Sequence, residues 1–269
     1  MTSDDKARRN LILEEMGLTP VWQLRDRGGA APVEEPAAES PISLPPSVVS
    51  REAVPVSRQS SVVSGGDDRR SSIMRMEWPA LKQAVASCTA CPLHAKRNKT
   101  VFGVGDENAD WLFVGEGPGA DEDAQGEPFV GQAGRLLDSM LAAIRLKRGH
   151  NVYIANVVKC RPPGNRNPEP AEAAACEPHL LRQIELIRPK LIVALGKVAA
   201  ANLLDSDASV ASMRGKVHDY RGMPLIVTYH PAYLLRTPPD KAKAWADLCF
   251  AVRTMAGLRG DEVAVAGKA

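Results

Sequence analysis

Four short hydrophobic runs divide the part of the chain that follows residue 76. They occupy residues 111–114, 152–155, 191–195 and 225–228 and contain almost no polar side chains. A strand with one solvated face alternates apolar and polar residues, whereas a strand covered on both faces is apolar throughout. The pattern therefore predicts four strands of a sheet that is buried on both faces.

Segments with helical periodicity lie between and around these runs. They comprise residues 77–87, 134–146, 170–187, 197–204 and 239–256. Strands that alternate with helices in this order favour parallel pairing through helical crossovers. We expect an α/β fold of three α/β/α layers around a central four-stranded parallel sheet.

The N-terminal part of the chain has a different pattern. Residues 3–16 form an amphipathic helical segment, and residues 28–72 are rich in Pro, Ser, Glu, Val and Gly without a sustained period. Such a composition has too little apolar surface to offset the entropy lost on ordering. We expect a disordered N-terminal extension over residues 1–75, in which the helix is either a docking element or merely a solvated helix. A folded domain follows over residues 76–269.

Composition restricts the function only weakly. The chain has 34 Lys and Arg residues against 32 Asp and Glu residues, so the net charge alone indicates no partner. The first residues lack the charged and apolar regions of a secretory signal, and no apolar run is long enough to span a bilayer. We therefore expect a cytoplasmic protein without a membrane partner. A reducing cytosol favours metal ligation by cysteines over disulfide bonds.

Polar motifs follow each of the four expected strands. The loop 115–123 follows the first strand, Asn156 ends the second, and residues 196–197 and 229–230 follow the other two. Open α/β sheets bind ligands at the carboxyl ends of their strands, so we expect these segments to meet in one crevice. The loop 115–123 lacks both G-x-G-x-x-G and a terminal Lys-Ser/Thr, which argues against a dinucleotide site and a P-loop.

Four cysteines indicate a metal centre. Cys88 and Cys91 form a C-x2-C pair, while Cys160 and Cys176 lie far along the chain and apart from each other. Zinc and iron–sulfur clusters both accept four thiolates, and the spacing alone does not decide between them. Cys249 lies in an apolar helical segment and is expected to be a packed core thiol.

The combined motifs resemble family 4 uracil-DNA glycosylases, the iron–sulfur branch of the uracil-DNA glycosylase superfamily. The resemblance covers residues 77–256. It is carried by residues 88–93, 115–119 with Glu122 and Asp123, 127–131, 156–166 and 230–236.

This resemblance implies a monofunctional enzyme of base excision repair. Such an enzyme flips deoxyuridine out of DNA and hydrolyses its N-glycosidic bond, which releases uracil and leaves an abasic site. The resemblance also implies a 4Fe-4S cluster held by Cys88, Cys91, Cys160 and Cys176. We expect a monomer that acts on single- or double-stranded DNA containing uracil. Residues 1–75 are a candidate docking segment for a repair or replication partner.

Five residues are expected to bind the substrate. Phe129 is suited to stack on the uracil ring, and the amide of Asn156 can accept from N3–H and donate to O4. A fixed amide would disfavour cytosine, which presents the reverse polarity. Gly117 stands where the cluster-free branch has its water-activating Asp, and its loop offers backbone N–H groups. The segment 233–236, which contains Leu234, could serve as the wedge that fills the space left by the flipped base, with ordinary packing as the alternative for Leu234, and Arg236 would contact phosphate.

Four residues are expected to support catalysis. His230 ends a buried strand and would donate a hydrogen bond to uracil O2, where negative charge develops as the bond breaks. Glu116 and Glu122 match family positions that place the base and the nucleophilic water. Asn165 is a candidate for positioning that water.

Two other functions remain open on these residues. The chain could be a non-catalytic iron–sulfur DNA-binding module that serves a DNA polymerase through residues 1–75. Alternatively, its main substrate could be another deaminated base, such as hypoxanthine. Loss of turnover with retained DNA binding, after substitution of Asn156 and His230, would distinguish an enzyme from a binding module.

Overall fold

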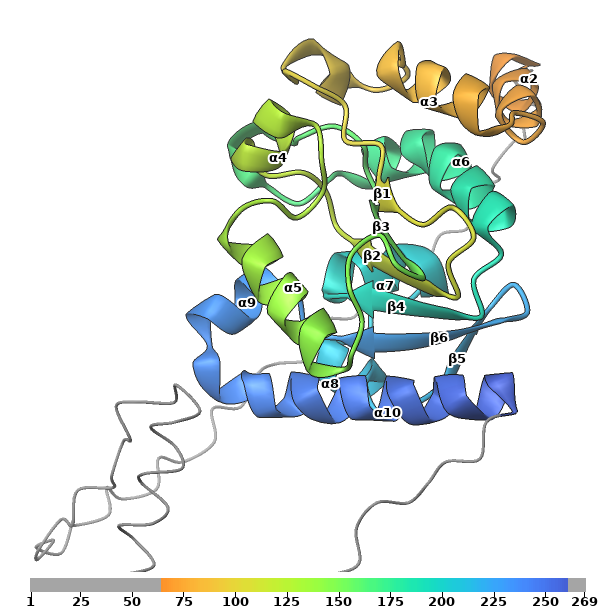
Figure 1. Ribbon diagram of the computed structural model, residues 1–269. Coiled ribbons are helices and arrows are strands. Elements are labelled where there is room, and N and C mark those ends of the chain that lie inside the picture. Colours follow the sequence, from red (N-terminus) through yellow and green to blue (C-terminus); the bar gives the residue numbers. More distant parts are fainter. Residues whose placement is uncertain (1–63, 261–269) are drawn as a thin grey trace, which may run out of the picture. The chain divides into compact units, whose positions relative to one another are not determined.

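The computed structural model describes residues 64–260, built around a six-stranded sheet (Figure 1). The strand order is β1-β3-β2-β4-β6-β5. The bounds of the strands are β1 Val104–Gly105, β2 Trp111–Gly115, β3 Val152–Asn156, β4 Leu191–Leu195, β5 His218–Tyr220 and β6 Met223–Thr228. The four inner strands are parallel, and β1 and β5 add antiparallel edges.

The predicted parallel strands are confirmed, but the sheet is wider than expected. Each of the four hydrophobic runs forms one inner strand. The two edge strands were missed because they are two and three residues long and carry no apolar run. Short, polar strands at a sheet edge give almost no periodic signal.

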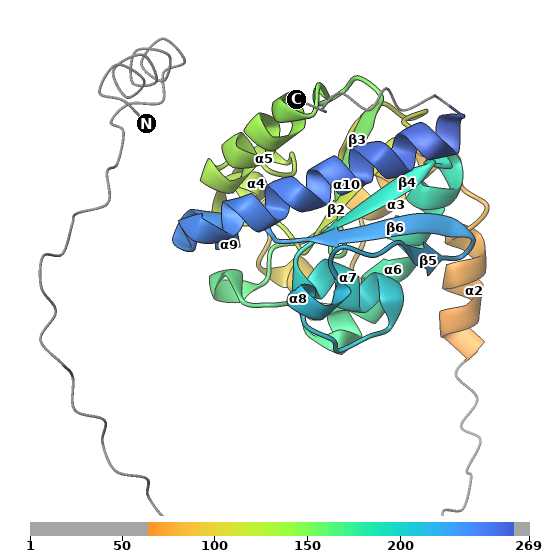
Figure 2. The ribbon, with the colours of Figure 1, turned by 90° about the horizontal axis from the view of Figure 1, so that it is seen from below.

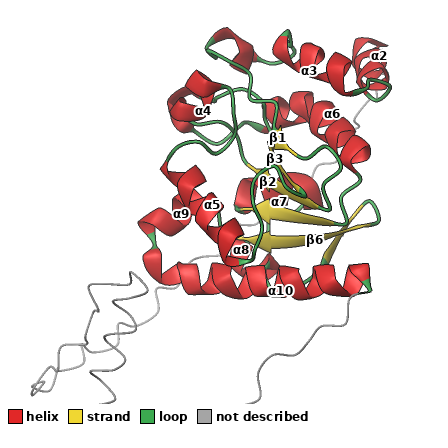
Figure 3. Cartoon of the chain, in the orientation of Figure 1, coloured by secondary structure: helices red, strands yellow, loops and turns green. Residues whose placement is uncertain are grey.

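The sheet is the middle of three layers (Figures 2 and 3). Alternate residues of β2 point to opposite faces: Leu112 and Val114 pack in the cluster that contains α6 and α7, whereas Phe113 packs in the cluster that contains α5 and α10. These helices are α5 Gln132–Ala143, α6 Pro170–Ile187, α7 Lys197–Leu204 and α10 Lys241–Arg259. The expected α/β/α architecture is therefore confirmed.

The long helices fall where their periodicity placed them, and the short ones were missed. The helix expected over 77–87 is α3, Trp78–Ala86, and α6 and α7 have the expected bounds. The segments missed are α4 Ala120–Gln125, α8 Val210–Met213, α9 Pro231–Arg236 and the 3-10 turns Pro92–Ala95, Pro163–Asn165 and Pro238–Asp240. One or two helical turns do not repeat often enough to define a period.

Helix α2, Ser64–Ile73, moves the expected domain boundary. Its Arg69 donates from Nη1 to the carbonyl of Ala175 on α6 at 3.0 Å, and its Arg70 pairs with Glu177 on the same helix. The end of the segment that we expected to be a linker is therefore helical and packed, so the boundary near residue 75 was wrong. The helix expected over 3–16 and the rest of the linker lie outside the described residues.

None of the helices within residues 64–260 is both long enough and apolar enough to cross a membrane.

The register of the inner strands aligns their carboxyl ends. Gly115 at the end of β2 pairs with Asn156 at the end of β3, and Leu195 of β4 pairs with Thr228 of β6. The connections leave β2 and β4 in opposite directions along the sheet, which creates a switch point between them. Open α/β sheets bind ligands at such a point, so the topology alone predicts a ligand site at the carboxyl ends of β2 and β4.

Candidate active site

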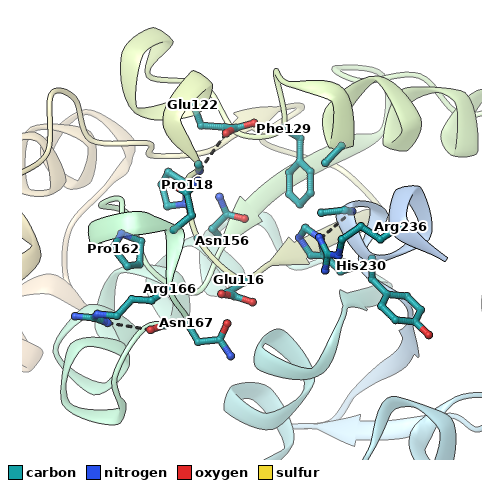
Figure 4. A pocket seen from close by; sticks show the side chains of 16 residues that line it. Glu116, Pro118, Glu122, Phe129, Asn156, Pro162, Arg166, Asn167, His230 and Arg236 are labelled. Atoms are coloured by element: carbon teal, nitrogen blue, oxygen red, sulfur yellow. Dashed lines mark hydrogen bonds between the residues drawn. The ribbon is translucent and has the colours of Figure 1, made fainter.

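A cavity of about 380 Å³ lies at the carboxyl ends of the parallel strands (Figure 4). Its walls come from the segments that follow β2, β3 and β6, together with the loop that precedes α5. In Figure 4 the side chains of Glu116, Phe129, Asn156 and His230 surround one common space. Three of the four motifs that the sequence placed at strand ends, those after β2, β3 and β6, therefore line this cavity, whereas residues 196–197 do not.

Asn156 presents an unpaired acceptor to this cavity. The residue is buried, with 2% of its surface exposed, and its Oδ1 has no hydrogen-bond partner among the described residues. Its backbone carbonyl is held by Nζ of Lys159 at 2.9 Å. Buried polar atoms are rarely left unpaired, so an unpaired oxygen at a cavity wall indicates a ligand that donates to it.

Gly115 forms the floor between two of these side chains. A Cβ at this position would lie 2.4 Å from Oδ1 of Asn156 and 2.5 Å from Cζ of Phe129. Real Cβ atoms do not approach other atoms so closely. The glycine is therefore required for the amide and the ring to occupy their present places.

Phe129 supplies an apolar wall. Its ring centroid lies 5.5 Å from that of His230, and 6% of its surface is exposed. Its backbone has φ of +56°, in the left-handed region that non-glycine residues seldom occupy. Strained backbone of this kind tends to mark functional sites, where the surrounding structure holds it in place.

His230 is arranged as a neutral hydrogen-bond donor. It caps the N-terminus of α9, and its Nδ1 accepts from the backbone N–H of Ala232 at 3.1 Å. The pKa of His230 is lowered to about 4, mainly by burial and in smaller part by the charge of Arg236, while the charge of Glu122 opposes the shift. A neutral imidazole whose Nδ1 accepts carries its proton on Nε2.

The two glutamates of the cavity have different environments. Glu116 is half-buried, and burial raises its pKa. Glu122 instead accepts backbone N–H groups, from Gly119 to Oε2 at 3.0 Å and from Val130 and Gly131 to Oε1 at 3.0 and 3.2 Å. Glu116 is thus the carboxyl suited to proton transfer, whereas Glu122 connects two loops.

The four predicted metal ligands line a second, smaller cavity. Cys88, Cys91, Cys160 and Cys176 all contribute to it, and Cys249 on α10 does not. Within residues 64–260, no three His, Cys, Asp or Glu side chains are arranged to hold one metal ion. The cysteines therefore surround a common space without converging on a single point.

Basic groups face these thiols. Arg97 donates from Nη1 to Sγ of Cys160 at 3.1 Å, and the backbone N–H of Lys159 donates to Sγ of Cys176 at 3.3 Å. Burial raises the pKa of the Cys176 thiol to about 11, and it raises the pKa of the Cys160 thiol as well. Four ionised thiols in so buried a space need a strongly cationic occupant.

A comparison with protein families identifies the superfamily of this chain. The model of the uracil DNA glycosylase superfamily matches residues 102–249, more than half of the chain. The chain belongs to this superfamily.

Type-4 uracil-DNA glycosylases are among its curated relatives. The chain is 48% identical to that of Archaeoglobus fulgidus over 162 residues, which cover 57% of this chain and 81% of the relative. It is 49% identical to that of Thermotoga maritima over 165 residues, 61% of this chain and 85% of the relative. For the enzyme of Pyrobaculum aerophilum, identity is 41% over 183 residues, 65% of this chain and 93% of the relative.

Most residues that the uracil-DNA glycosylase resemblance implied lie at the cavity wall. They are Glu116, Gly117, Glu122, Phe129, Asn156, Asn165, His230 and Arg236. Asn165 lies on the exposed loop after β3, where its Oδ1 accepts from Nε of Arg161 at 2.7 Å. Its oxygen therefore has a partner within the loop, unlike that of Asn156.

Within the expected wedge segment 233–236, Leu234 is packed rather than exposed. It is buried, with 1% of its surface exposed, and packs with Met140, Ala244 and Leu248. This burial favours the alternative of ordinary packing for Leu234, because α9 turns its side chain inward onto α5 and α10. Its neighbour Leu235 is 40% exposed.

Sequence reasoning missed two basic residues that hold segments of the cavity wall in place. Lys159 is fully enclosed and donates from Nζ to the Asn156 carbonyl and to Oε1 of Gln183 at 2.6 Å. Arg148 donates to the carbonyls of Pro128 and Phe129. Lys159 could have been noticed as a charge directly after an apolar run, whereas nothing in the sequence distinguishes Arg148 from other surface arginines.

Proposed function

We propose that this protein is an iron–sulfur uracil-DNA glycosylase of base excision repair. The observation that carries the proposal is the unpaired Oδ1 of buried Asn156 at the wall of the cavity. The type-4 uracil-DNA glycosylases among its relatives support the same activity.

Base recognition rests on Asn156 and Phe129. The Oδ1 of Asn156 accepts from N3–H of uracil, and its amide nitrogen donates to O4. Cytosine has an acceptor at N3 and a donor at C4, so both contacts would become repulsive. The ring of Phe129 stacks on the base, and Gly115 leaves room for it. Reading the base in this way requires the nucleotide to leave the duplex.

Bond cleavage rests on His230 and Glu116. As the bond between C1′ and N1 breaks, its electrons pass to uracil, and the Nε2–H of His230 donates to the negative charge on O2. Water adds to C1′ of the sugar, and its proton passes to the Glu116 carboxylate. Burial raises the pKa of that carboxyl, which makes the carboxylate a stronger base.

The exposed end of α9 is suited to contact DNA. Within the segment 233–236, Leu235 is our proposed wedge, since its side chain is exposed next to residues that line the cavity. Arg236 lines the cavity and is exposed, so it can contact a phosphate that flanks the flipped nucleotide. Filling the vacated stack with an apolar side chain is a general device of proteins that distort DNA.

The second cavity fits a 4Fe-4S cluster. In a zinc site all four sulfurs lie within about 2.3 Å of one ion, whereas each cysteine of a cluster binds a different iron and stands farther apart. The four cysteines share one cavity, and the type-4 uracil-DNA glycosylases among the relatives support the cluster as its occupant. When bound, the cluster would supply a cationic iron core that links the segments of Cys88, Cys160 and Cys176.

Uracil release tests the proposal. The protein is purified anaerobically and incubated with oligonucleotides that carry a single deoxyuridine, deoxycytidine, thymidine or deoxyinosine. Release of uracil alone, with an abasic site left behind, supports the proposal. Faster release of hypoxanthine would favour a glycosylase for another deaminated base, and release of no base by cluster-loaded protein would refute the enzyme.

A further inference from the structure

The segment that carries Phe129 is under backbone strain. Residues 128–131 form the last part of the connection between α4 and α5, and within them Phe129 has φ of +56° and a buried ring. This left-handed conformation is unfavourable for an aromatic residue unless surrounding groups stabilise it. Other groups must therefore hold the segment in place.

Two side chains of opposite charge hold four consecutive residues. Arg148 donates from Nη1 to the carbonyl of Pro128 at 2.7 Å and from Nη2 to the carbonyl of Phe129 at 2.8 Å. The Glu122 carboxylate accepts the next two backbone N–H groups, from Val130 and Gly131. Hydrogen bonds to charged groups are stronger than those between neutral groups, so the strained segment is fixed at each residue.

Arg148 is itself held in position. It lies in the tight turn between Lys147 and His150, which form an antiparallel bridge, and its Nε donates to Oδ1 of Asp138 on α5 at 3.1 Å. All three guanidinium nitrogens of Arg148, which lie in one plane, thus donate hydrogen bonds. A lysine ammonium could not reproduce this fork.

The Phe129 carbonyl has little freedom to move. A Cβ at Gly134 would lie 1.8 Å from the Phe129 oxygen, so the first turn of α5 packs directly on this carbonyl. At the other end of the residue, the tip of the Phe129 ring packs against Gly115. A change in the backbone of Phe129 would therefore move the ring within the cavity.

We propose that Arg148 is a positioning residue for base excision. It holds Phe129 in the left-handed conformation that places its ring against the flipped uracil. Arg148 does not line the cavity, so it acts through Phe129. The proposal rests on the proposed function, because it assigns the ring to uracil.

A measurement without substrate tests the positioning step. The chain has four phenylalanines, so labelling with 4-fluorophenylalanine gives four ¹⁹F resonances, and Phe129→Leu identifies that of residue 129. Arg148→Ala is expected to shift or broaden this resonance and to leave the other three in place. Arg145→Ala is the matched control, since Arg145 is an exposed arginine of the same connection. If Arg148→Ala fails to fold, Arg148→Lys is expected to give the same change to a smaller extent.

Kinetics test whether the position matters for excision. We expect Arg148→Ala to lower kcat/KM for uracil release by roughly 100-fold, the typical effect of a misplaced binding group. The double variant with Phe129→Ala should be no slower than Phe129→Ala alone, because Arg148 acts through that ring. A merely structural arginine would give losses that multiply.

The outcomes separate this proposal from the proposed function. Wild-type protein that releases no uracil refutes the function, while the ¹⁹F spectra still decide whether Arg148 positions Phe129. An unchanged Phe129 resonance in Arg148→Ala overturns the inference. Losses in kcat/KM that multiply in the double variant overturn it as well.

Discussion

The backbone N–H of Ala232 donates to Nδ1 of His230 at 3.1 Å. This bond occupies the lone pair of Nδ1 and leaves the ring proton on Nε2. Because burial lowers the pKa of His230 to about 4, the imidazole stays neutral in the native state near neutral pH. The proposed donor to uracil O2 is therefore set in place before the substrate binds.

The protonation state of His230 can be measured directly. The native residue should titrate near pH 4, whereas an unperturbed histidine titrates near 6.5. As the pH falls from 6.5 towards 4, His230 becomes protonated in the unfolded chain while it stays neutral in the native protein. The stability contributed by this residue is therefore complete above pH 6.5 and is lost towards pH 4. Proton–nitrogen correlation spectra at pH 7 should show a bare Nδ1 and a protonated Nε2, and the opposite tautomer would disprove this arrangement.

Gly115 should tolerate no side chain. Gly115→Ala places a methyl group against both the Asn156 amide and the Phe129 ring, so we expect kcat/KM for uracil release to fall by roughly 100-fold. The control is Gly257→Ala, at an exposed helical position with open space around it. That change should leave excision unaltered and stabilise the protein by about 0.5–1 kcal/mol in denaturant titrations. Wild-type activity in Gly115→Ala would contradict the proposed floor of the pocket.

The neighbouring leucines of α9 should respond in opposite ways. Leu234→Ala removes a buried side chain and should lower the free energy of unfolding by about 2–5 kcal/mol. Leu235→Ala should leave stability within about 0.5 kcal/mol and slow excision from duplex DNA more than from single strands, because only a duplex leaves a gap to fill. Unfolding curves and excision rates on both substrates measure this pair. Equal slowing on the two substrates would exclude Leu235 as the wedge.

The cysteines offer a matched comparison within one chain. Anaerobically purified wild-type protein should be brown and contain iron and sulfide. Cys160→Ser should lose that colour and unfold at a lower temperature, since the cluster would link segments far apart in sequence. Cys249→Ser, outside the cysteine cavity, should keep both properties. A colourless wild-type sample loaded with zinc would contradict the cluster.

The sequence predicted the layers of the fold because they depend on long periodic segments. The runs that became β2 and β4 and the segment that became α6 were defined by many residues each. The edge strand β5 and helix α9 were not, since their few residues take their shape from neighbours rather than from a period of their own. Leu234 and Leu235 show the limit most clearly, because adjacent identical residues differ only in which way α9 turns them.

Site residues followed the same division. The positions of Asn156 and His230 were predictable because Asn156 ends β3 and His230 follows the end of β6, at the edge of the sheet where ligands bind. The bonds of Glu122 and Arg148 to the 128–131 segment were not, since both depend on the course of a loop that carries no periodic signal. Helix α2 was not predicted for a similar reason. Its composition is polar, and the contact of Arg69 with α6 depends on the tertiary fold rather than on a local pattern.

Single-turnover release of uracil by the wild type and by Asn156→Ala tests the central claim most directly. Both proteins are loaded with cluster and given the same oligonucleotide with one deoxyuridine, and their DNA affinities are measured alongside. We predict that the wild type leaves an abasic site and that the variant binds DNA with similar affinity but releases uracil roughly 10²–10³-fold more slowly. A cluster-loaded wild type that releases no uracil, or a variant as fast as the wild type, would contradict the account.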